Sequence, residues 1–183
     1  MNCHIYNQPN KLIYKDDLIT KFLIESPKYG DFEIMIDTED YDRIKNYRWH
    51  IQYVKHTNNF YVSSLIKKNN KWKNYQLHRL LLNLTDPELQ IDHKFGKTLD
   101  NRKSELRICN HSENVRNQKI HKNNKSGFKG VSLYKLNNKW KAQINYNGKK
   151  IALGYYKTTN EAALAYNEAA KKYHGEFAML NKI

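Results

Sequence analysis

A strict alternation of apolar and polar residues near the C-terminus is the feature that most restricts the fold. In residues 139–146, KWKAQINY, every second residue is apolar, with Lys, Gln and Asn between. Successive side chains of a strand point to opposite faces, so the segment predicts a half-buried strand with a basic, amide-bearing outer face. The residues predicted to face inward are Trp140, Ala142, Ile144 and Tyr146. Those predicted to face outward are Lys139, Lys141, Gln143 and Asn145.

Two further alternating runs flank this strand, separated from it by the turn signals LNN and NGKK. An Ala-rich segment follows, and Thr158 with Glu161 predicts a capping box at its start. The small residues of that helix allow it to approach a sheet closely. This region therefore predicts a small three-stranded antiparallel sheet packed on one helix. The flanking residues predicted to point inward are Val131, Leu133, Ile151 and Leu153.

The distribution of charge indicates a polyanionic partner. The chain has 32 Lys and Arg against 18 Asp and Glu, a net charge of +14, and residues 122–183 carry 12 basic and 3 acidic residues of these. A basic excess on this scale favours nucleic acid. The same region is rich in Tyr and Trp, so we expect it to fold rather than form a disordered tail.

The C-terminal region resembles the DNA-binding domain of plant ethylene response factors. The matching features are Gly130-Val131, the strand from Lys139-Trp140 to Ile144, Leu153-Gly154, Glu161-Ala162-Ala163, Ala165-Tyr166, Ala169-Ala170, Gly175 and Leu180-Asn181. The resemblance implies that the sheet enters the major groove of double-stranded DNA, where amides read adenine and lysines hold phosphate or guanine. Several positions differ from the plant proteins, so their target sequence is not transferred. The implied DNA-binding residues are Lys129, Ser132, Tyr134, Lys139, Gln143, Asn145, Lys150 and Tyr155.

A second motif lies upstream, in residues 91–117, IDHKFGKTLDNRKSELRICNHSENVRN. It predicts a strand, a long loop, a second strand at LRIC and a helix. Asn110 and Glu113 form an Asx version of the capping box, so the helix should begin near His111. Asn114 would then lie in the first turn, able to face the strand end that carries Asp92 and His93.

The residue types in this motif suit hydrolysis of a phosphodiester. One carboxylate and one amide oxygen, from Asp92 and Asn114, are hard donors that fit Mg²⁺ or Mn²⁺ completed by water or phosphate oxygens. The neutral imidazole of His93 can take a proton from water near neutral pH. An ion held there would stabilise charge on the phosphate and on the leaving oxygen.

The motif resembles the HNH, or His-Me finger, nucleases, especially the homing endonucleases of phages and introns. The matches are Asp92-His93, Gly96, Leu99-Asp100-Asn101-Arg102, Leu106-Arg107, and Asn114 with Asn117. The resemblance implies an α+β fold with a ββα-metal module, His93 as general base, and Asp92 and Asn114 as catalytic metal ligands. Arg102, Arg107 and Arg116 of the motif are predicted either to contact DNA phosphates or to be solvated charges, and Asn101, Glu105 and Asn117 to be structural residues of the site.

One position departs from the family pattern. Glu105 stands where the family usually has Asn before Leu-Arg. An amide both donates and accepts hydrogen bonds, whereas an ionised carboxylate only accepts and adds negative charge. Activity could therefore be reduced, shifted to another metal or lost.

These motifs predict two modules: an HNH nuclease domain with an N-terminal α+β scaffold in residues 1–121, and a DNA-binding domain in residues 122–183. Cys3 and Cys109 lie far apart, which excludes a four-thiolate zinc site and argues against a disulfide framework. No N-terminal leader and no membrane span is expected. We therefore expect a soluble intracellular protein of a bacterial cytoplasm or virus-infected cell, with a monomer favoured.

The function predicted first is a metal-dependent, site-recognising DNA endonuclease of the homing type, part of a mobile element, that nicks or cuts duplex DNA. The alternative is a DNA-binding regulator on a degenerate, non-catalytic nuclease scaffold, which Glu105 favours. A third interpretation, an RNA-binding protein, is disfavoured because the chain lacks paired motifs of exposed stacking aromatics.

Overall fold

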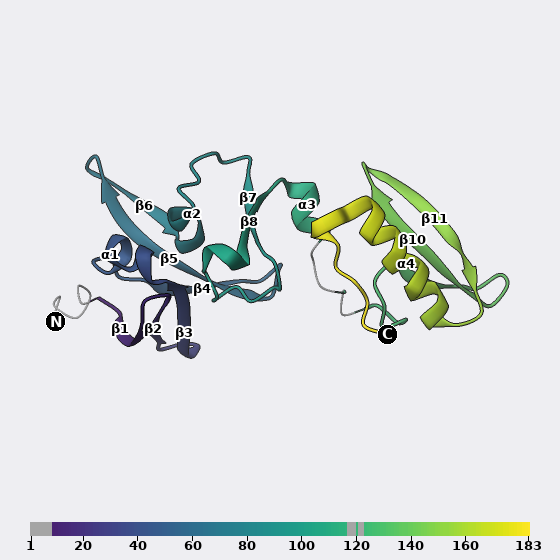
Figure 1. The fold of residues 1–183 in the computed structure, drawn as a ribbon, viewed down its shortest axis with the longest axis horizontal. Coiled ribbons are helices and arrows are strands. Elements are labelled where there is room, and N and C mark those ends of the chain that lie inside the picture. The colour runs from purple at the N-terminus through teal and green to yellow at the C-terminus, as the bar shows by residue number, and fades with distance from the viewer. Residues whose placement is uncertain (1–8, 117–119, 121–122) are drawn as a thin grey trace. The chain divides into compact units, whose positions relative to one another are not determined.

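The computed structural model describes residues 9–116, 120 and 123–183 (Figure 1). The chain divides into two compact units, Met1–Cys109 and Asn110–Ile183. The predicted boundary between residues 121 and 122 falls on residues outside the described part of the chain, and it stays a prediction.

Two three-stranded antiparallel sheets form most of the first unit. Their interior is a cluster of apolar side chains. The first sheet has the order β1-β2-β3, with β1 at Lys11–Lys15, β2 at Ile19–Ser26 and β3 at Gly30–Asp37. The second has the order β4-β5-β6, with β4 at His50–Val54, β5 at Asn59–Lys68 and β6 at Lys71–Gln76. The buried cluster consists of Phe22, Ile24, Ile34, Ile36, Ile44, Trp49, Val62, Leu77 and Leu81.

Two short helices complete this unit, α1 at Tyr41–Ile44 and α2 at Leu77–Leu81. A 3₁₀ turn at Thr38–Asp40, with Asp37 at its N-cap position, precedes α1. Leu77 and Leu81 are both buried and lie on one face of α2 because they are four residues apart. Their burial in the core stabilises this short helix, which follows β6 directly.

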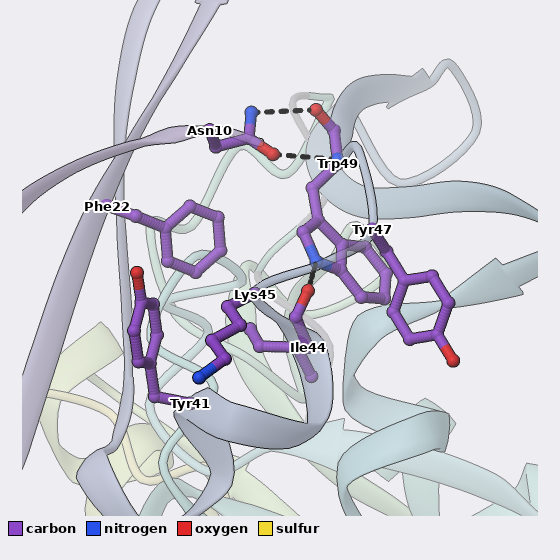
Figure 2. Close-up of a pocket in the computed structure, with 7 residues that line it drawn as sticks. All are labelled: Asn10, Phe22, Tyr41, Ile44, Lys45, Tyr47 and Trp49. Carbon is purple, nitrogen blue, oxygen red and sulfur yellow. Dashed lines mark hydrogen bonds between the residues drawn. The ribbon is translucent and has the colours of Figure 1, made fainter. Parts of the chain in front are cut away.

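The indole of Trp49 is a core group, because the side chain is buried in the apolar cluster of the first unit. Figure 2 shows its Nε1 donating to the carbonyl of Ile44 at 3.1 Å. Asn10 binds both the N–H and the carbonyl of Trp49, at 2.8 and 3.0 Å. The cavity beside Phe22 and Tyr41 has a volume of about 10 Å³, room for at most one water. It is a packing gap rather than a ligand site.

The predicted motif forms a two-stranded antiparallel sheet, β7 at Gln90–His93 and β8 at Leu106–Cys109, with a 3₁₀ turn at Lys103–Glu105 in the loop. Helix α3 follows at His111–Arg116. Its predicted capping box is present, because Asn110 Oδ1 accepts from the N–H of Glu113 at 2.9 Å and Glu113 Oε2 from that of Asn110 at 2.8 Å.

The predicted fold class is wrong. Strands dominate the described residues, in four small antiparallel sheets, rather than an α+β arrangement around a ββα-metal nuclease module. The strand pair β7-β8 belongs to the first unit, whereas α3 belongs to the second. The local order of strands and helix was correctly predicted, but local order does not determine which elements share a core.

The second unit contains the sheet β11-β10-β9, with β9 at Val131–Tyr134, β10 at Lys139–Tyr146 and β11 at Lys149–Tyr156. Helix α4, Thr159–His174, runs across one face of this sheet (Figure 1). Its capping box of Thr158 and Glu161 is present as predicted. The buried residues between sheet and helix include Val131, Ala142, Ile144, Ala162, Ala163, Tyr166, Ala169 and Ala170. Leu133 lies opposite Trp140, on the inward face as predicted, but its side chain is 46% exposed.

Gly130, which directly precedes β9, allows the Tyr166 ring of α4 to pack closely against the backbone. Its φ is +73°, a conformation that L side chains rarely adopt. A Cβ at this position would lie 2.0 Å from the Tyr166 ring and 2.6 Å from the carbonyl of Gln143. The glycine is therefore required both by the backbone and by the space.

Among the described residues, no helix is long and apolar enough to cross a membrane.

Candidate catalytic site and nucleic-acid interface

Strand β7 carries Asp92 and His93 at its end, and both side chains are buried. The register places Asp92 opposite Arg107 and His93 opposite Leu106 of β8. Directly opposed residues of an antiparallel pair share a face of the sheet. Asp92 and Arg107 therefore lie on one face, with His93 and Leu106 on the other.

Asp92 and Arg107 form a buried ion pair. Both Nε and Nη2 of Arg107 donate to Oδ2 of Asp92, at 2.8 and 2.6 Å. The two side chains are only 7% and 11% exposed, so water screens the pair weakly. A charge in this position depends on its partner, because an unpaired buried ion is costly.

The imidazole of His93 is held among aromatic rings and one amide. The His78 ring lies edge-on at 5.5 Å between centroids, and the Tyr61 ring lies at 6.2 Å. Nε2 of His93 is 3.5 Å from Oδ1 of Asn101, a long hydrogen bond. Burial lowers the pKa of His93 below its ordinary value, against the raising effects of Asn101, Asp92 and Asp100. The ring is therefore neutral at neutral pH, as a general base requires.

The loop between β7 and β8 is fixed by main-chain hydrogen bonds. The N–H of Asn101 donates to the carbonyl of Met35 in β3 at 2.7 Å, and that of Met35 to Leu99 at 3.1 Å. The two ends of the loop are joined, because the carbonyl of Glu105 accepts from the N–H of Lys94 at 2.9 Å. The main chain of Glu105 thus closes the loop at the position where the family pattern has an asparagine. Nδ2 of Asn101 is buried without a partner among the described residues.

The predicted arginine contacts are engaged within the protein. Arg102 holds Asp100 through Nε and Nη2, at 2.9 and 2.7 Å. The guanidinium carbon of Arg116 lies 5.8 Å from the centroid of the Tyr146 ring, within cation–π range. With Arg107 on Asp92, all three guanidinium groups have internal partners, and their contact with DNA stays a prediction.

The predicted metal ligands come from different units, Asp92 from the first and Asn114 from the second, so their pairing stays a prediction. The described residues hold no group of three or more His, Cys, Asp or Glu side chains suited to a metal. Mg²⁺ needs fewer protein ligands, because it keeps several waters. An ion at Asp92 would nevertheless share the carboxylate with the Arg107 guanidinium. Asn117, predicted as structural, lies outside the described residues.

The outer face of the β9–β11 sheet gathers most of the predicted DNA contacts. The register sets Ser132 opposite Lys141, and Lys141 opposite Tyr155. The rings of Tyr134 and Tyr155 touch across this face, 4.8 Å between centroids. We call this surface the outer sheet face. Its residues are Ser132, Tyr134, Lys139, Lys141, Gln143, Asn145, Lys150, Ala152 and Tyr155.

Lys129, predicted to contact DNA, is held inside the second unit. Its Nζ donates to the carbonyl of Arg116, and burial lowers its pKa to about 8. Its N–H donates to Oδ1 of Asn181 at 2.7 Å, and its carbonyl accepts from Nδ2 of the same residue. The residue joins the C-terminal segment to the start of the sheet, so its position suits a structural role.

The sequence alone assigned no site role to three residues that the structure brings to these surfaces. His78 and Tyr61 pack against His93, yet both are distant from it in the sequence. Lys141 lies in the middle of the outer sheet face. The period-two alternation of residues 139–146 predicted its outward position, but Lys141 was not among the predicted DNA contacts.

Three curated proteins show what the chain is similar to. A protein of Acanthamoeba polyphaga mimivirus, named an uncharacterized HNH endonuclease, is 32% identical over 113 residues, 59% of this chain and 58% of that protein. An ethylene-responsive transcription factor of Arabidopsis thaliana is 40% identical over 58 residues, 31% of this chain and 14% of the relative. An APETALA2-like protein of Oryza sativa is 38% identical over 56 residues, 31% of this chain and 13% of the relative.

The chain thus spans 58% of the viral relative's length and a much smaller share of the plant proteins. No family model and no solved structure matches it.

Proposed function

We propose that this protein is a DNA endonuclease that binds duplex DNA through the outer sheet face and hydrolyses a phosphodiester with His93 as general base. The observation that carries the proposal is the buried, neutral imidazole of His93 at the end of β7. The viral relative named as an HNH endonuclease and the plant relatives named as transcription factors support the nuclease and DNA-binding parts respectively.

In the proposed reaction, His93 takes a proton from water as the water oxygen attacks the phosphorus. Asn101 limits rotation of the ring through its contact with Nε2. The P–O3′ bond breaks, which would leave a 5′-phosphate and a 3′-hydroxyl after the leaving oxygen gains a proton. The loop from Lys94 to Glu105 keeps His93 in place, because Leu99 and Asn101 in its middle are hydrogen-bonded to β3 and its two ends to each other.

Asp92 and Asn114 are the residues that would hold Mg²⁺ or Mn²⁺ in this proposal. The bound ion would supply stabilisation of negative charge on the phosphate and on the leaving oxygen. The Arg107 guanidinium orients Asp92 and competes with a cation for the same carboxylate.

Binding to DNA would use the lysines of the outer sheet face for phosphate and the amides of Gln143 and Asn145 for base edges. A site-recognising enzyme of the homing type needs such a reader beside its cleavage centre. Digestion of a randomised duplex library, with the ends mapped, tests this part: a defined site supports it and random ends contradict it.

Plasmid nicking tests the catalytic part. Wild-type protein with Mg²⁺ should convert supercoiled plasmid to the nicked or linear form, and His93→Ala should reduce the rate by about 10²- to 10⁴-fold. His56→Ala, which removes an exposed histidine, is the matched control. Circular dichroism of each variant separates a lost base from a lost fold. Equal rates for His93→Ala and wild type would exclude His93 as the base.

A DNA-binding regulator without catalysis is the second candidate. The Asp92–Arg107 pair favours it, because a carboxylate already neutralised by a guanidinium is a weaker cation ligand. Tight duplex binding with no cleavage in Mg²⁺ or Mn²⁺ would establish this function and reject the endonuclease.

A further inference from the structure

A cleft of about 650 Å³ lies in the first unit, apart from the residues predicted to act in catalysis. It is lined by β6, by α2 and by residues 83–85 that follow this helix, with one residue each from β4 and β5. Figure 1 shows β6 leading directly into α2. The volume falls within the range of about 300–1,000 Å³ that is typical of small-ligand sites.

The charge of the lining is positive. Lys68, Lys73 and Arg79 line the cleft, and no Asp or Glu does. The Arg79 guanidinium is fixed, because it donates to the carbonyls of Leu89 at 2.8 Å and of Asp86. A fixed cation beside two lysines favours an anionic ligand, and phosphate is a common anion held in this way.

The neutral part of the lining suits a flat ring with polar edges. Tyr75 contributes an aromatic ring, with the Lys68 ammonium 5.1 Å from its centroid. Leu80 and Leu84 add apolar surface. The amide of Asn83 accepts from Arg43 through Oδ1 at 2.7 Å, which orients the amide and leaves Nδ2 as the end that can donate to a ligand.

The same hairpin carries an exposed aromatic residue next to the cleft in sequence. Trp72 is 66% exposed, and it precedes the cleft residue Lys73. An exposed tryptophan among lysines is the kind of group on which unpaired bases stack. The lysines outside the cleft on this hairpin are Lys67 and Lys71.

We propose that this cleft binds a nucleotide, with the phosphate held by Lys68 and Lys73 and the base against Tyr75. The ligand is a free nucleotide or one nucleotide of an unpaired nucleic-acid strand, since both present the same phosphate and base. This proposal goes beyond cleavage and does not require His93 to be a base.

Titration of the full-length protein with adenosine monophosphate, in the presence of EDTA, tests the site. Two-dimensional NMR should show shifts of the side-chain amide signals of Asn74, Gln76 and Asn83, which line the cleft. Lys68→Gln with Lys73→Gln should weaken binding by about tenfold. Lys67→Gln with Lys71→Gln removes the same charge from the same hairpin outside the cleft, and should change the affinity by less than about twofold.

A six-nucleotide single strand, titrated in the same way, identifies the source of the nucleotide. Tighter binding of the strand than of the mononucleotide, lost in Trp72→Ala, assigns the cleft to a strand. Equal binding assigns it to a free nucleotide. Absence of shifts at the cleft amides, or equal effects of the two double variants, would overturn the proposal. None of these readouts involves cleavage, so a failed endonuclease assay leaves the test intact.

Discussion

The surroundings of His93 and the outer sheet face use charge in opposite ways. Near His93 the ionised groups are covered and paired, as in the Asp92–Arg107 and Asp100–Arg102 contacts. On the outer sheet face, Lys139 and Asn145 are exposed. The difference shows that charged groups near His93 fix the local geometry, whereas those on the outer sheet face remain available to a polyanion. Stability near His93 should therefore depend on both partners of each ion pair and on pH. DNA binding by the outer sheet face should depend on salt.

Breaking the Asp92–Arg107 pair should have the largest effect. Arg107→Met leaves a carboxylate 7% exposed without its guanidinium, and we expect a loss of about 3–5 kcal/mol in the free energy of unfolding. Urea denaturation measures it. Adding Asp92→Leu should recover most of the loss, because the unpaired charge is then removed. A single variant as stable as wild type would show that the pair does not hold this region.

Acidification should destabilise the protein through His78. Burial lowers the pKa of His78 to about 3, so the folded state keeps the ring neutral where the unfolded chain takes up a proton. The stabilising contribution is complete above the unfolded pKa of 6.5, and falls as pH decreases below that value, by about 1.4 kcal/mol per unit. His78→Phe should show a shallower dependence between pH 6.5 and 4.5. The free energy of unfolding is measured by urea denaturation at each pH. An equally steep pH dependence for the variant and wild type would show that His78 does not cause it.

Single substitutions on the outer sheet face should divide into two kinds. Gln143→Ala should change sequence preference by about 1–3 kcal/mol at one base pair, if its amide reads a base edge. Lys139→Ala should instead weaken all sequences similarly and reduce the salt slope by about one. Fluorescence anisotropy on specific and random duplexes at several salt concentrations measures both. Identical salt slopes for Lys139→Ala and wild type would show that the outer sheet face is not part of the DNA interface.

Glu105→Asn should have the smallest effect. The motif alone predicts faster cleavage from an amide at this position, and the structure limits the gain, because the main chain of Glu105 already closes the loop. We expect an increase of no more than about threefold, attributable to the loss of negative charge. Glu105→Gln should behave alike, since it removes the same charge. A slower Glu105→Asn enzyme would show that the carboxylate has a positive role.

Local patterns predicted the second unit better than the first. The alternation of residues 139–146 and the pairing of Thr158 with Glu161 each specify an element within a few residues, and both are present. Strands β1 and β2 carry Lys, Tyr and Ser among their apolar residues and were not predicted. Strand β6 ends at Gln76 and α2 begins at the next residue. The helix forms there because Leu77 is buried in the core, which the local pattern does not indicate.

The candidate site was predictable only where sequence neighbours suffice. Asp92 and His93 follow from a strand end, and the capping of α3 follows from Asn110. The partners that tune them come from far along the chain: His78 reaches His93 from α2, and Met35 fixes the loop from β3. Such contacts depend on how the sheets pack, which no local spacing encodes. The fold class was wrong for the same reason.

The pH dependence of single-turnover nicking, at saturating DNA and constant Mg²⁺, tests the central claim most directly. Because burial lowers the pKa of His93 below 6.5, the rate should be retained down to about pH 6.5 and fall at lower pH as the imidazole gains a proton. His93→Ala should lack this acidic fall and be slow throughout. A wild-type rate that already falls with acidification above pH 6.5, or a His93→Ala variant with the wild-type profile, would contradict a neutral His93 as the base.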